Sequence, residues 1–112
     1  AAERALRAGA AVVAAHGSHS IGKVERRGAA LVAWGLGNLR FSCDCTDEPD
    51  GLVLRVELGP GGVRSAAVLP IEAGLRGRPA RAAPGSSATG ILDLLESLGS
   101  RLRRQGAMGW VD

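Results

Sequence analysis

The fold of this chain is constrained most by a pair of short apolar runs in its sequence. Each run is followed directly by a polar or glycine-rich loop. Residues 10–15 are small or branched apolar residues, and the loop after them carries His16 and His19. Residues 29–34 form a second run, and a Gly-Leu-Gly-Asn sequence follows it and ends at Asn38. Runs of this length are typical of buried strands, and the loops after such strands often hold ligands in α/β sheets. We therefore predict an α/β protein of mixed α+β type, with its candidate chemistry in these loops.

A hairpin is predicted further along the chain. Residues 52–58 alternate toward their end, with Leu54, Val56 and Leu58 on one side, as in a half-buried strand. A Gly-Pro-Gly-Gly sequence at residues 59–62 predicts a turn, and residues 63–71 predict the returning strand.

Helices are predicted at both ends of the chain. Residues 1–8 resemble the end of a helix that Gly9 closes. A final helix is predicted at about 88–104, with Ser86 or Ser87 as its cap. The apolar residues at helical spacing in this segment are Ile91, Leu94, Leu95, Leu98 and Leu102.

The composition favours an incomplete domain. Aromatic residues make up only 3% of the 112 residues, and a core of Ala, Val and Leu buries less area per side chain. The chain has no run of about 20 apolar residues that could span a membrane. It begins with Ala1 rather than Met. We therefore expect a missing N-terminal region, through which membrane association of the parent protein is possible.

The charge is modestly basic, with a formal net charge of +3. Its densest cluster is Arg101, Arg103 and Arg104. Basic residues without interleaved aromatic residues are a weak signal for nucleic-acid binding. We expect a solvated helix face here and no nucleic-acid partner.

The loop before residue 52 holds two cysteines and several carboxylates. Cys43 and Cys45 are too close in sequence to pair without strain, so we predict two reduced loop thiols. Two cysteines alone do not make a zinc site. The carboxylates are expected to be solvated rather than ligating, and they are Asp44, Asp47, Glu48 and Asp50.

His16 and His19 are the only histidines, and they leave the end of the first predicted strand. Small residues between them let the two imidazoles approach one point, and neutral imidazole is a common ligand of divalent metals. Two loop histidines are also often plain polar surface residues, and two ligands cannot close a metal site. From these residues alone, both interpretations stay open.

A family resemblance adds to this pattern. Residues 9–19 resemble the Gly-Ala-Asp-Val-Val-x-Gly-His-x-x-His segment of the CapA family, the poly-γ-glutamate and capsule-synthesis branch of the metallophosphoesterase fold. Val24 and Glu25 match the hydrophobic-Glu pair that follows in the family. Residues 34–39, with Phe41 after them, resemble its aromatic-Ser-Leu-Gly-Asn-Phe segment. The resemblance runs from about residue 9 to about residue 80.

The resemblance implies a fold, a cofactor and a site. Residues 1–112 would be the C-terminal half of a metallophosphoesterase-like β-sandwich flanked by helices, hence an incomplete domain. His16 and His19 would bind divalent metal ions, in a dinuclear pair such as Mn, Fe or Zn, and Asn38 would stand near the site. The remaining ligands of such proteins come from motifs that precede this segment. The implied location is the bacterial cell envelope.

Two classes of function compete within the resemblance. The parent protein would be a metal-dependent hydrolase of a phosphoester or related bond, with this chain inactive by itself. Alternatively, it would be a non-catalytic accessory protein for the synthesis or export of an anionic polymer. A truncated product without activity of its own is a further alternative.

Overall fold

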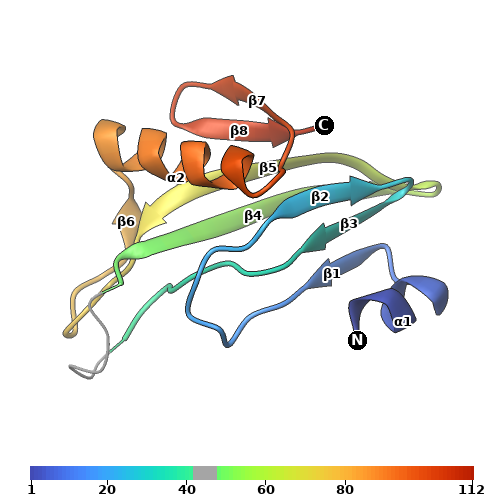
Figure 1. The fold of residues 1–112 in the computed structure, drawn as a ribbon, viewed down its shortest axis with the longest axis horizontal. Coiled ribbons are helices and arrows are strands. Elements are labelled where there is room, and N and C mark those ends of the chain that lie inside the picture. Colours follow the sequence, from blue (N-terminus) through green and yellow to red (C-terminus); the bar gives the residue numbers. More distant parts are fainter. Residues whose placement is uncertain (42–47) are drawn as a thin grey trace.

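The computed structural model of the protein describes residues 1–41 and 48–112. Within these residues the chain is a mixed α+β domain, mostly strands, with two helices and two sheets (Figure 1). The elements in chain order are α1 (Ala2–Arg7), β1 (Val12–Ala14), β2 (Val24–Arg27), β3 (Ala30–Ala33), β4 (Asp50–Gly59), β5 (Gly62–Glu72), β6 (Arg81–Ala82), α2 (Gly85–Ser97), β7 (Leu102–Gln105) and β8 (Met108–Val111).

The smaller sheet has the order β1-β3-β2 and carries the candidate site. β1 pairs in parallel with β3, from Val12 beside Leu31 to Ala14 beside Ala33. β2 pairs antiparallel to β3 on its other side. The two apolar runs of the sequence are therefore neighbouring parallel strands. Of the two, only the central strand β3 is largely buried as predicted, whereas the edge strand β1 is half-buried with Ala14 exposed. Strand β2 lies between β1 and β3 in sequence. The charged residues of this segment left no apolar run from which a strand could be predicted.

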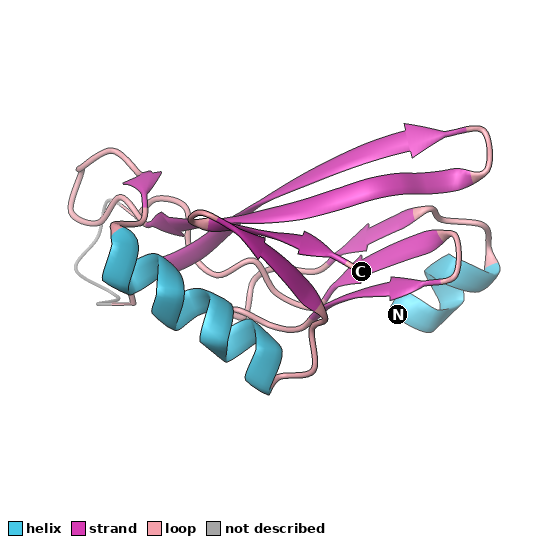
Figure 2. Ribbon diagram, turned by 90° about the horizontal axis from the view of Figure 1, so that it is seen from above, coloured by secondary structure: helices cyan, strands magenta, loops and turns pink. Residues whose placement is uncertain are grey.

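The larger sheet has the order β4-β5-β8-β7, with β6 beside β5. The predicted hairpin is confirmed as β4 and β5, which run side by side along the length of the molecule (Figure 2). The register shifts between Glu57 and Leu58, which marks a β-bulge. Leu54 and Val56 are half-buried as predicted, but Leu58 is 57% exposed. The prediction that Leu58 faces the same side as Leu54 and Val56 was wrong. Leu58 lies beyond the register shift, where Arg64 is an extra residue on β5, and such a shift changes the local twist of the strand pair.

The final helix is shorter than the predicted segment 88–104 and lies nearer the N-terminus. It begins at Gly85 after Pro84, and neither Ser86 nor Ser87 caps it through a side chain. It ends at Ser97, and Gly99 follows with a φ of +102°. Glycine adopts this left-handed conformation without steric cost, so the chain turns out of the helix there. The residues that follow form the β7–β8 hairpin instead of further helix.

One hydrophobic core joins both sheets and α2. The helix packs on β5 and β8, and β3 also contacts β5 (Figure 1). The largest fully buried side chains come from β2, β3, β5 and α2, and they are Leu31, Ile91, Leu92, Leu95, Val24, Val32, Val68 and Pro70. The described residues thus share a single core, and small aliphatic side chains build it.

Charged side chains of the C-terminal hairpin pair with acids. Arg104 binds Asp93 and Glu96 of α2, at 2.5 and 2.6 Å, and Arg103 lies 3.7 Å from Asp112. The prediction of a solvated helix face was therefore wrong: Arg103 and Arg104 are on β7 and Arg101 precedes it, and Arg104 joins β7 to α2. Exposed ion pairs of this kind contribute little to stability individually.

Candidate functional site

The candidate site lies at the carboxyl ends of β1 and β3. Because these strands are parallel, the loops that follow them leave from the same edge of the sheet. The pairing extends past β1, since the backbone N–H of Ala15 donates to the carbonyl of Ala33 at 2.8 Å. The loop with His16 and His19 therefore begins beside the segment that leads to Asn38.

Glycines let the two loops lie directly against each other. The backbone N–H of Gly22 donates to the carbonyl of Gly35 at 3.0 Å. A Cβ on Gly35 would meet the carbonyl oxygen of Ser20 at 2.5 Å, closer than real Cβ contacts come. Gly22 and Gly35 are thus required by the close approach of the two backbones.

The structure brings His19 and Asn38 into contact. Nδ1 of His19 lies 3.1 Å from Oδ1 of Asn38, and the amide Nδ2 donates to the carbonyl of Glu48 at 3.0 Å. Asn38 is only 2% exposed, whereas His19 is at the surface. The family resemblance alone predicted Asn38 near the site. In the structure its buried side chain contacts the exposed His19.

Two further features hold His19 in place. Its ring lies 5.0 Å from that of Phe41, centroid to centroid, at an interplanar angle of 57°. Its φ is +61°, a left-handed conformation that is uncommon for residues other than glycine. Such conformations persist where the surroundings determine them, and they occur often at functional sites.

The backbone around Asn38 is fixed against β4. The N–H of Asn38 donates to the carbonyl of Asp50 at 3.2 Å, and the N–H of Leu52 donates to that of Leu36 at 2.8 Å. Gly37 has a φ of +70°, and a Cβ there would meet the Asp50 carbonyl at 2.4 Å. Gly37 is therefore the residue that allows Asn38 to reach its position.

His16 faces a separate, mostly apolar hollow beside this contact. The hollow has a volume of about 580 Å³ and is lined by Ala14, His16, Leu36, Gly37, Asn38, Leu39, Leu52, Val53 and Leu54. Its size is within the range of small-molecule pockets. Asn38 belongs to both features, since it lines the hollow and also contacts His19. No hydrogen bond joins His16 to His19 or Asn38 in the described part of the chain.

The potential metal ligands are few. Among residues 1–41 and 48–112, no group of three or more His, Cys, Asp or Glu side chains could hold a metal ion. Cys43 and Cys45, with Asp44 and Asp47, lie outside the described residues. Two imidazoles leave most of a coordination sphere open, so the described residues cannot complete a metal site alone.

The carboxylates at the start of β4 are not arranged around the histidines. Asp50 is paired in register with Glu72 on β5. Burial raises the pKa of the Asp50 carboxyl, and the neighbouring charges of Glu48 and Glu72 add to the effect. Glu25, which matched the family pattern, lies on β2 between Lys23 and Arg27 and forms ion pairs with both.

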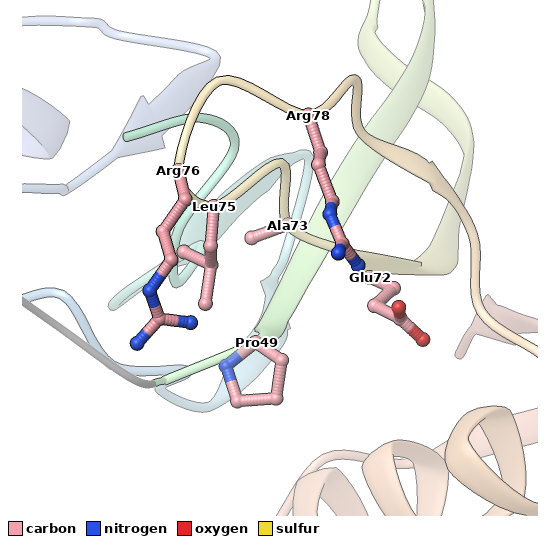
Figure 3. Close-up of a pocket in the computed structure, with 6 residues that line it drawn as sticks. All are labelled: Pro49, Glu72, Ala73, Leu75, Arg76 and Arg78. Carbon is pink, nitrogen blue, oxygen red and sulfur yellow. The ribbon is translucent and has the colours of Figure 1, made fainter. Parts of the chain in front are cut away.

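A second hollow lies next to the loop after β5 (Figure 3). It has a volume of about 310 Å³, and it is lined by Pro49, Glu72, Ala73, Leu75, Arg76 and Arg78. Figure 3 shows the guanidinium group of Arg78 next to Glu72, with Arg76 on the far side of Pro49. The ion pair of Glu72 is with Arg81, at 3.0 Å. The mixed charges do not favour an anion over a cation here, so the histidine loop stays the stronger candidate.

Comparison with known proteins adds no relative. The sequence matches no protein-family model and no curated protein. In the part of the chain that the structure describes, no helix is both long and apolar enough to cross a membrane.

Proposed function

We propose that this chain is the C-terminal part of a CapA-like domain with a metallophosphoesterase-like fold. The parent protein would act as a metal-dependent hydrolase of a phosphoester or related bond, in the bacterial cell envelope. The observation that carries the proposal is the meeting of the His19 and Asn38 loops at the carboxyl edge of two parallel strands. Ligands of α/β proteins gather at such edges.

The donor atoms fit part of a divalent metal site. His19 has one ring nitrogen against a buried amide, the kind of outer partner that orients most metal-binding histidines. His16 is exposed and shares the loop, and the imidazole of each residue suits Mn, Fe or Zn. The remaining ligands would come from residues of the parent protein outside this chain.

In this proposal, the side chains of the chain bind and orient. A metal pair would polarise the phosphoryl oxygens and lower the pKa of a bound water. His16 and His19 would each donate one nitrogen, and Asn38 would fix the orientation of the His19 ring. The apolar hollow beside His16 leaves room for part of a substrate and would limit the access of water.

Histidine substitutions in the complete gene product test the proposal. We expect His16→Ala and His19→Ala each to lower the bound metal and the phosphoesterase activity together, since loss of one ligand strongly weakens a site. Ser18→Ala is the matched control, because it changes the same loop and leaves both imidazoles. Metal content would be measured by elemental analysis, and activity with aryl phosphomonoesters and phosphodiesters. Unchanged metal content in both histidine variants would remove the ligand assignment.

The second candidate is a non-catalytic accessory protein for an anionic polymer. The observation that favours it is the modest positive charge of the chain, formally +3, which suits a polyanionic partner. If the parent protein is such an accessory protein, His16→Ala and His19→Ala should leave polymer production unchanged. Neither the unsubstituted protein nor the variants should hydrolyse phosphoesters.

A further inference from the structure

We propose that Asn38 is a positioning residue that sets the tautomer of His19, so that Nε2 is the ligating atom of this histidine. The tautomer itself follows from contacts within the chain. Its use in metal binding rests on the function proposed above.

The contact with Glu48 decides the orientation of the Asn38 amide. A backbone carbonyl only accepts hydrogen bonds, so the atom 3.0 Å from the Glu48 oxygen must be the amide nitrogen. A flipped amide would set two oxygens against each other at that distance. The orientation thus follows from the hydrogen-bond network, as it does for most amides. It leaves the Asn38 oxygen facing His19.

The oriented amide then decides where the imidazole proton lies. Oδ1 of Asn38 only accepts, so Nδ1 of His19, at 3.1 Å, must donate. A neutral imidazole has one N–H, so the lone pair of neutral His19 is on Nε2. Free histidine in water favours the opposite tautomer, with its proton on Nε2, so the contact works against the intrinsic preference.

The Asn38 side chain has little freedom to relax. It is 2% exposed, its own backbone N–H is bonded to Asp50, and Gly37 holds the chain close to β4. A buried amide oxygen that loses its donor costs more free energy than an average hydrogen bond contributes. Phe41 limits the tilt of the His19 ring from another side. The protein therefore holds the His19 ring with its lone pair on Nε2 before a metal binds, which reduces the reorganisation that metal binding would require.

The test is the tautomer ratio of His19 in the metal-free chain. Nitrogen-15 spectra of the two imidazoles at about pH 8, above the usual histidine pKa, distinguish protonated from unprotonated ring nitrogens. His16 has no such partner in the described part of the chain and serves as the internal reference. We expect His19 to favour the Nδ1–H form relative to His16 by about fivefold to tenfold, as one hydrogen bond would produce.

One variant sharpens the result. Asn38→Ala should bring the His19 ratio to that of His16, because it removes the oxygen that accepts from Nδ1. Equal ratios for His16 and His19 in the wild type would overturn the proposal, and that comparison decides even where Asn38→Ala unfolds. An unchanged ratio in a folded Asn38→Ala variant would overturn it too. Because no metal is present, this outcome is independent of the metal content measured in the histidine variants.

Discussion

Substituting Gly37 by alanine should disturb the candidate site through the backbone alone. Gly37 has a φ of +70°, and an alanine in the left-handed region costs about 1–2 kcal/mol. Its Cβ would also meet the carbonyl oxygen of Asp50 at 2.4 Å, so the loop must move. Overpacking of this kind costs about 1–3 kcal/mol more. We expect Gly37→Ala to lower the free energy of unfolding by about 2–5 kcal/mol.

Gly28 provides a matched control for that substitution. Its φ is +60°, and a Cβ there would meet nothing within 4 Å. Gly28→Ala carries the same backbone cost and the same effect on the unfolded chain, so the difference between the two variants isolates the clash. Urea unfolding should show Gly37→Ala less stable than Gly28→Ala by about 1–3 kcal/mol, or about 0.7–2 M in midpoint at an m-value of about 1.5 kcal/mol/M. Equal midpoints would refute the close packing of this loop on β4.

Three further outcomes are expected. Leu95→Ala should lower the free energy of unfolding by about 2–5 kcal/mol, because the side chain is fully buried, whereas Leu94→Ala on the outer face of α2 should cost under about 1 kcal/mol. Equal losses of the two variants in urea unfolding would contradict the packing of Leu95 in the core. Burial raises the pKa of the Asp50 carboxyl, so the folded state keeps this proton at a pH where the unfolded state has lost it. The contribution of Asp50 to the free energy of unfolding therefore falls as pH rises from the unfolded pKa through the raised folded pKa. Asp50→Asn should remove this part of the pH dependence when unfolding is measured from acid to neutral pH, and an unchanged dependence would contradict the burial of Asp50. Replacing Cys43 and Cys45 together by Ser should leave the metal content of the complete gene product unchanged, and elemental analysis showing a loss would end the interpretation as free loop thiols.

Sequence periodicity predicted several of the strands and the final helix. It failed where a single residue changed the geometry of the backbone. The β4–β5 hairpin followed from alternation and its Gly-Pro-Gly-Gly turn. The exposure of Leu58 did not, because the pairing becomes irregular beside it, where β5 has Arg64 as an extra residue that the alternation of β4 does not record. Leu102 lies at helical spacing from Leu98, yet it is on β7, because Gly99 turns the chain out of the helix.

The candidate site was predicted in its residues but not in its contacts. His16 and His19 stood out as the only histidines, after a predicted strand. The contact of His19 with Asn38 depends on the parallel pairing of β1 with β3, a long-range feature that a local pattern does not contain. The carbonyl of Glu48, which orients Asn38, left no signal because any residue supplies a backbone carbonyl. The metal role of both histidines stays a prediction.

The most direct measurement of the central claim is the position of a metal in the complete gene product. Crystals grown with Mn²⁺ or Zn²⁺ would locate the ion by its anomalous scattering. The account predicts a metal about 2.0–2.2 Å from Nε2 of His19, with a ring nitrogen of His16 coordinating the same ion or its neighbour. A metal bound elsewhere, or both imidazoles free of metal at saturating concentration, would contradict the account.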